Sequence, residues 1–209
     1  MMGYKQMPKG YNSVNSPYGR KVRVAEIETQ QRGLIEWTFM SREERSKEMP
    51  SINPLGKIPA LILENGDLLI DSPVIASWID DQHKNRRLIP EAIAERWLVL
   101  NLEALGDGLG DAAIAVALEA SRPKKNQSDT WIMRNNQKVY QTLAFLNDQI
   151  GSSQSALNMG GIAVACAIGY MEFREVATDW RKKHSRLADW YDTMQQRDSF
   201  KETAIDVKV

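Results

Sequence analysis

The sequence predicts a protein in two parts, an α/β first half and an all-helical second half. Up to about residue 84, short apolar runs of strand length alternate with helical patterns. From Ala92 onward, apolar side chains recur only at helical spacing. The polar segment Asp81–Glu91 contains a proline and breaks the helical pattern, which is typical of a linker. We therefore expect one domain at residues 1–84 and a second at 85–209.

The composition excludes several classes of partner. Twenty-seven basic and 27 acidic residues give a formal net charge of zero, so no bulk charge attracts nucleic acid or an anionic membrane. No apolar run approaches the ~18 residues of a membrane span, and Met1–Pro8 lacks the apolar centre of a signal peptide. One cysteine and two histidines are too few for a disulfide framework or a zinc site. We expect a cytoplasmic protein without a metal.

Two strands are expected at the start of the first domain. The first, Tyr11–Asn15, follows a loose leader at Met1–Lys9 and is a poor strand, because it has only two apolar side chains and asparagine is depleted in strands. The second, Ile35–Met40, alternates apolar and polar residues and is rich in β-formers. The charged segment Ser41–Ser51 has no such pattern, and we expect it to be mobile.

A helix is expected to begin between the two strands, directly after Ser16. Serine suits the N-cap position, and the missing N–H of Pro17 is harmless in a first turn. Ser16 has two interpretations. It is a structural cap only, or its hydroxyl, aided by the helix dipole, hydrogen-bonds a bound thiolate and lowers the pKa of the thiol.

The richest stretch runs from Asn53 to Asp81. Two apolar runs, Ala60–Leu63 and Leu68–Ile70, flank Asn65-Gly66, the dipeptide that favours a two-residue type I′ hairpin turn. Asp71-Ser72-Pro73 then offers a cap residue followed by proline, which predicts the start of another helix.

Ile58-Pro59 stands where the chain enters this hairpin from a loop. An X-Pro bond is the one place where a cis peptide is cheap, at about 0.5 to 1 kcal/mol against trans. A cis bond would turn the N–H and C=O of Ile58 outward, where an extended peptide can pair with them. The N–H groups at the following helix start would hold a carboxylate. The predicted ligand is therefore a small anionic peptide.

These residues resemble the glutathione S-transferase family, and most closely its bacterial, serine-type, theta-like members. The resemblance rests on S-P-Y-G-R-K-V-R from Ser16, on N-P-L-G-K-I-P from Asn53, and on D-S at a helix start. It extends from about Tyr11 to about Thr203. It implies a thioredoxin-like N-terminal domain with an all-α C-terminal domain, and a homodimer.

The resemblance also implies roles for individual residues. Pro59 is the cis-proline, and Ile58 pairs with the cysteinyl part of glutathione. Lys57 lies near the glycyl carboxylate, and Asp71 and Ser72 hold the γ-glutamyl end.

For the thiol, the resemblance favours Ser16 as the activating residue, with Ser13 as the alternative. The implied reaction is conjugation of glutathione to a small apolar electrophile, as in detoxification, although peroxidase, dehalogenase and isomerase variants stay open. Two other functions are retained as alternatives: a non-catalytic binding protein for glutathione or hydrophobic ligands, and a dimeric scaffold. The polar first strand gives the non-catalytic alternative some weight.

In the second half, two stripes are expected to be buried: Trp97, Leu98, Leu102 and Leu105 in one, and Trp131, Val139, Leu143 and Leu146 in the other. Cys166 lies within an apolar run and is expected in the core. At the start of that helix, Asn158 and Gly161 replace the family's Ser/Thr-x-x-Asp capping box. Asn158 can still cap, but Gly161 cannot return a hydrogen bond.

Three acids recur at i, i+4 and i+8: Glu103, Asp107 and Asp111. Such a like-charge column disfavours an isolated helix, and three nearby glycines disfavour it further. Either these acids are solvated or hydrogen-bonded to neighbouring helices, or they line a cleft between the two halves. The resemblance places Glu103 and Asp107 beside the second-substrate pocket.

Overall fold

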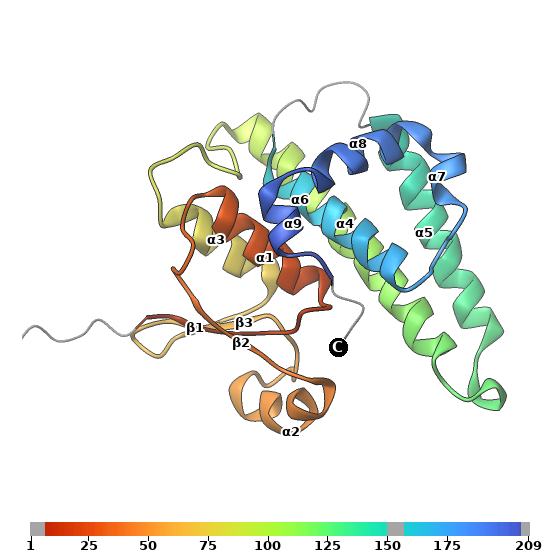
Figure 1. The fold of residues 1–209 in the computed structure, drawn as a ribbon, viewed down its shortest axis with the longest axis horizontal. Coiled ribbons are helices and arrows are strands. Elements are labelled where there is room, and N and C mark those ends of the chain that lie inside the picture. The colour runs from red at the N-terminus through yellow and green to blue at the C-terminus, as the bar shows by residue number, and fades with distance from the viewer. Residues whose placement is uncertain (1–6, 150–156, 206–209) are drawn as a thin grey trace, which may run out of the picture.

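The computed structural model describes residues 7–149 and 157–205. Its first half is a four-stranded mixed sheet in the order β2-β1-β3-β4, in which β1 pairs parallel with β2 and antiparallel with β3. Helices α1 and α3 cover one face of the sheet and α2 lies on the other (Figure 1). The bounds are β1 Lys9–Asn12, α1 Pro17–Glu28, β2 Glu36–Phe39, α2 Arg42–Ile52, β3 Ala60–Ile62, β4 Leu68–Leu69 and α3 Ser72–Asp81. The predicted α/β first half is confirmed.

Strand β1 differs from its predicted position. It begins at Lys9 and ends at Asn12, so it starts at the last residue of the expected leader and stops three residues before the predicted end. Gly10 is needed there, because a Cβ on it would lie 2.4 Å from the ring of Trp37 in the neighbouring strand. The polar Asn12 is fully buried. Strand β1 therefore lacks the apolar alternation typical of a strand, because the apolar contact at Gly10 comes from Trp37 of β2.

The segment Ser41–Ser51, expected to be mobile, is helix α2. Its start is a capping box, in which the Ser41 hydroxyl accepts from the N–H of Glu44 and the Glu44 carboxylate accepts from the N–H of Ser41. Only Met49 of this helix is buried, so no apolar stripe marks it in the sequence. The S-x-x-E spacing of Ser41 and Glu44 is the one local signal that indicates this helix.

The hairpin forms where expected, but its turn is different. Leu61 pairs with Leu69 and Ile62 with Leu68, while the N–H of Leu63 donates to the carbonyl of Asp67. Three residues therefore form the loop, and of these only Gly66, at φ +90°, has a positive φ. A type I′ turn needs positive φ at both central residues, so this is a three-residue turn with glycine at the left-handed position.

The second half is helical throughout its described residues, as predicted. Its elements are α4 Ile93–Ala120, η1 Lys124–Asn126, α5 Asp129–Gln149, α6 Met159–Phe173, α7 Trp180–Lys183, α8 Ser185–Gln195 and α9 Asp198–Glu202. Helix α6 lies at the centre: it packs against α4, and against α1 of the first half. The Asn158 side chain caps it by accepting from the N–H of Gly161 at 2.9 Å. None of the helices in residues 7–149 and 157–205 could cross a membrane.

The core includes most, but not all, of the predicted stripes. Cys166 is buried, and burial raises the pKa of its thiol to about 11, so it is an unreactive core residue as expected. Leu102 is buried too, but Trp97 and Leu98 are 65% and 71% exposed, and the prediction that they are buried was wrong. Trp131 is likewise exposed at 48%.

Candidate functional site

A cleft of about 460 Å³ lies between the two halves. Six segments line it. Four belong to the first half: the β1–α1 loop, the start of α2, the loop before β3 and the start of α3. Two belong to the helical half: part of α4, and the end of α6 with the residue that follows it. Ser13, Ser16, Lys57, Ile58, Pro59, Asp71, Ser72 and Asp107 are among its lining residues. Of the residues singled out from the sequence, Glu103 is outside this lining.

Asn12 positions the β1–α1 loop. Its amide donates to the carbonyl of Gly19 at 3.0 Å, and its carbonyl oxygen accepts from the N–H of Ser13 at 2.7 Å. The polar end of the first strand therefore ties the sheet to the first turn of α1. The asparagine that makes this strand look poor in the sequence is the residue that holds Ser13 and Ser16 in place.

Ser16 caps α1, because its hydroxyl oxygen accepts from the N–H of Gly19 at 3.1 Å. This bond uses a lone pair and leaves the O–H free to donate into the cleft. The cap and the thiolate contact are thus compatible. Asn15, which the sequence analysis did not single out, also lines the cleft, and its buried side-chain oxygen has no hydrogen-bond partner among the described residues. A ligand N–H would satisfy it.

The loop before β3 is held by Asn53. Its side chain donates to the carbonyl of Lys57 at 2.8 Å and accepts from the N–H of Leu55 at 3.0 Å. The Ile58–Pro59 peptide bond is cis. Within the described residues, the N–H and C=O of Ile58 pair with no other group, so an extended peptide can bind there.

Asp71 and Ser72 stand at the N-terminus of α3. Asp71 is the N-cap residue, but its carboxylate makes no capping hydrogen bond, and it is exposed to the cleft. Ser72 is buried within the first turn. The helix start therefore offers N–H groups to a carboxylate and a neighbouring carboxylate to an ammonium group, which matches the two charges of an amino-acid end.

The acidic column of α4 is mostly satisfied from within the protein. Lys21 of α1 donates to Glu103 at 2.9 Å and to Asp107 at 2.7 Å, and the Lys21 and Glu103 side chains are 1% and 3% exposed. Glu103 is therefore a buried partner that joins the two halves, which corrects its assignment to the second-substrate cleft. Asp107 reaches the cleft, and burial raises its pKa despite the opposing charge of Lys21.

Tyr18 is the other side chain near this column. Its hydroxyl donates to the carboxylate of Asp111. Burial, and then this hydrogen bond, raise the pKa of Tyr18 far above its usual value. Tyr18 thus keeps its proton, and that proton is already bonded. It is not available to stabilise a thiolate in the cleft.

Comparison with known proteins decides the family. Residues 15–82 match the family model of the glutathione S-transferase N-terminal domain, and residues 129–193 match that of the C-terminal domain. The chain is 32% identical over 196 residues to the GST-like protein YibF of Escherichia coli (strain K12), covering 91% of this chain and 95% of YibF. This chain belongs to the glutathione S-transferase family.

Two solved structures of the family are especially similar. A glutathione transferase family member from Pseudomonas fluorescens Pf-5, with bound glutathione, shares 37% identity over 96% of this chain and 100% of its own, with a TM-score of 0.90. A structure from the same organism with bound S-(propanoic acid)-glutathione shares 36% identity, with coverage of 97% and 99% and a TM-score of 0.86. The glutathione S-transferase fold is therefore confirmed, whereas the roles of individual site residues stay predictions.

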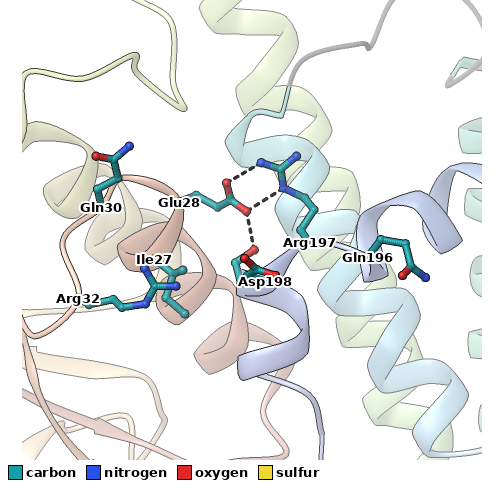
Figure 2. A pocket seen from close by; sticks show the side chains of 8 residues that line it. Ile27, Glu28, Gln30, Arg32, Gln196, Arg197 and Asp198 are labelled. Carbon is teal, nitrogen blue, oxygen red and sulfur yellow. Dashed lines mark hydrogen bonds and ion pairs between the residues drawn. The ribbon is translucent and has the colours of Figure 1, made fainter.

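A second hollow of about 410 Å³ lies away from the cleft between the two halves, between the end of α1 and the start of α9 (Figure 2). Its two arginines are each paired with a carboxylate. Arg197 binds the Glu28 carboxylate through two hydrogen bonds of 2.7 Å, and Ser199 donates to the same carboxylate. Arg32 at its rim pairs with Glu202. Both arginines of this hollow are therefore paired, whereas the exposed Asp198 at the start of α9 forms no ion pair within the part of the chain that the structure describes.

Proposed function

We propose that this protein is a glutathione transferase in which the thiolate of glutathione attacks a small electrophile. One observation carries the proposal. The cleft brings together the residues that would hold the three parts of the tripeptide, although they come from separate segments of the first half. Asp71 and Ser72 would bind the γ-glutamyl end, Ile58 the cysteinyl backbone, and Lys57 the glycyl carboxylate.

Ser16 would stabilise the thiolate. Its hydroxyl lines the cleft at the N-terminus of α1 and retains a donor that the cap does not use. Lowering the thiol pKa from about 9 to about 6 or 7 requires roughly 3 to 4 kcal/mol, since one unit is 1.36 kcal/mol. A hydrogen bond to a charged group together with a helix dipole supplies an energy of this order.

The first test is calorimetric titration of glutathione into the wild type and into Asp71→Ala at neutral pH, without an electrophile. Saturable binding that the substitution abolishes would support the site. Absence of binding at millimolar glutathione would refute the proposal and favour a non-catalytic carrier of hydrophobic ligands or a dimeric scaffold.

Turnover is tested separately with Ser16→Ala, and Ser13→Ala is the matched control, since both serines line the cleft. We expect Ser16→Ala to lose at least about 100-fold in kcat/KM, because removal of one donor to a developing or bound anion has an effect of this size. Glutathione affinity should stay within about threefold, as expected when a group acts on the thiolate rather than on the tripeptide. If the wild type, with both serines intact, binds glutathione but shows no turnover, the protein is the non-catalytic alternative.

The polar first strand no longer favours that alternative. Asn12 is buried and has two hydrogen bonds that hold the β1–α1 loop. Asn158 likewise retains the cap of α6. Both departures from the family pattern thus have structural roles, and neither removes a group from the cleft.

We further propose a cytoplasmic homodimer. Ile93, Trp97 and Leu98 form an exposed apolar patch at the start of α4, and such a patch is typical of an interface. Trp97→Glu should yield monomers by light scattering after gel filtration, whereas Phe145→Glu, an exposed apolar site on α5, should leave the dimer intact. The cytoplasm holds the reduced glutathione pool that the reaction needs.

A further inference from the structure

The cleft is lined by three arginines that the proposed glutathione contacts do not use. Arg42 and Arg45 come from the first turn of α2, and Arg174 directly follows α6. Within residues 7–149 and 157–205, none of the three is paired with a carboxylate. The guanidinium of Arg45 makes only a long hydrogen bond, 3.4 Å, to the carbonyl of Ser41.

Tyr170 of α6 supports Arg174. The Nε of Arg174 donates to the Tyr170 hydroxyl at 3.2 Å, and its guanidinium carbon lies 5.5 Å from the Tyr170 ring centroid and 5.3 Å from that of Phe173. Two aromatic rings thus orient a guanidinium that still has unused N–H donors. Tyr170 itself is buried and lines the cleft.

Arg45 occupies an environment that disfavours its charge. It is half-buried, and burial followed by the neighbouring charge of Arg42 lowers its pKa, with Tyr170 acting in the opposite direction. Two arginines with no carboxylate between them repel each other, and a bound anion would relieve this repulsion. The α4 carboxylates in the cleft differ, because Asp107 is already bonded to Lys21 and Asp111 to Tyr18.

The two carboxylates of glutathione already have proposed partners, so the three arginines are not needed to bind it. Its two carboxylates are assigned to the α3 start at Ser72 and to Lys57 by the proposed function. Arg174, which follows α6 in the helical half, lines the same cleft as Ile114 and Leu118 of α4. Arg174 of the helical half and the two arginines of α2 are thus available to the second substrate.

We propose that the second substrate is a small electrophile that carries a carboxylate, which Arg174 and Arg45 bind while Ile114, Leu118 and Tyr170 contact its apolar part. This inference rests on the proposed transferase function and names its substrate class. It replaces the purely apolar electrophile expected from the sequence.

An aryl chloride acid illustrates the balanced reaction. With 4-chloro-3-nitrobenzoate, the glutathione sulfur forms a C–S bond at the carbon that bears chlorine, the C–Cl bond breaks, and chloride leaves with the bonding electron pair. The thiol proton goes to solvent. The carboxylate takes no part in the bond changes, so the arginines position the substrate through it.

The decisive test compares binding of three stable ligands by calorimetry: S-methylglutathione, S-(carboxymethyl)glutathione and S-(carbamoylmethyl)glutathione. The last two differ essentially in charge. We expect the acid to bind about tenfold more tightly than the amide, because a hydrogen bond to a charged group is worth about 1.5 to 3 kcal/mol before solvent screening. Equal binding of all three overturns this inference and retains the glutathione site. Failure of all three to bind overturns the proposed function itself.

Arg174→Gln and Arg45→Gln should each reduce the preference for acid over amide at least threefold, and Arg174→Lys should retain part of it. Arg134→Gln is the matched control: Arg134 is exposed on α5 and does not line the cleft. Equal weakening of all three ligands by the cleft variants would mean that these arginines hold the tripeptide, which overturns the inference.

Turnover gives an independent readout. The ratio of kcat/KM for 4-chloro-3-nitrobenzoate to that for 4-chloro-3-nitrobenzamide should fall about tenfold in Arg174→Gln, an effect of the size of one charged contact. The value for the amide alone should stay within twofold to threefold, roughly the spread of a neutral substitution. An unchanged ratio would contradict the inference even if both substrates react.

Discussion

The arginines in the two hollows of this protein differ in whether they are paired with carboxylates. Between α1 and α9, Arg197 is bonded to Glu28 and Arg32 to Glu202, whereas in the cleft between the halves Arg42, Arg45 and Arg174 have no such partners among the described residues. A charge that is paired within the chain stabilises the fold. A charge left unpaired beside a cavity is available to a ligand. The difference separates structural from functional charges without reference to any relative.

A paired, buried charge also lies behind the cleft, at Lys21 and Glu103, and it yields the largest expected effect. Lys21→Met should cost about 3 to 5 kcal/mol in the free energy of unfolding, because it leaves Glu103 charged, buried and unpaired. The measurement is urea unfolding at pH 7. Lys47→Met, which breaks a pair that is 71% and 78% exposed, is the control and should cost less than about 1 kcal/mol. Equal losses would show that Lys21 is not a structural charge.

The same substitution, arginine to glutamine, should have opposite effects in the two hollows, and both effects should be of medium size. Arg197→Gln is expected to cost about 1 kcal/mol of stability, since it removes a bidentate pair to a largely buried carboxylate, and to leave glutathione affinity unchanged. Arg174→Gln should behave in the opposite way, with unchanged stability and altered ligand preference. If Arg174→Gln destabilised the protein more than Arg197→Gln, the comparison would fail.

The pH dependence of stability tests the structural role of the Arg197–Glu28 pair. Burial alone would raise the pKa of Glu28, but hydrogen bonds from Arg197 and Ser199 outweigh it and hold that pKa below its usual value. A carboxyl group whose pKa is lowered in the folded state contributes its full stabilisation above the unfolded pKa of about 4.3. That stabilisation is lost as the pH falls through the folded pKa. The stability difference between wild type and Arg197→Gln should therefore shrink between about pH 6 and pH 3. A constant difference would contradict the ion-pair assignment.

The smallest effect is expected at the rim. The pair of Arg32 and Glu202 is about half exposed on both sides, so Arg32→Gln should leave the melting temperature unchanged at physiological salt. A clear loss would mean that exposed pairs in this hollow act as a network with Glu28.

Much of the fold and of the cleft could be predicted from local sequence. The order of elements, the hairpin, and the starts of α1 and α3 depend on short-range rules of capping, proline placement and alternation, which act within a few residues. For the same reason Ser16, Ile58, Asp71 and Ser72 could be singled out together. Helix α2 obeyed such a rule as well, through the capping box at Ser41 and Glu44, even though its sequence has no apolar stripe.

The tertiary structure alone decided which long-range partners each residue has. Asn12 is unfavourable in a strand by propensity, but the first turn of α1 supplies a hydrogen-bond partner for its side chain. Gly106 is unfavourable in a helix, but α6 packs so closely that a Cβ there would lie 2.6 Å from its backbone. Glu103 and Arg174 are both charged residues on or beside a helix, and nothing local distinguishes them. Lys21, 82 positions away, neutralises Glu103, and no carboxylate in the described residues does so for Arg174. Charge pairing depends on distance in space, which the sequence does not state.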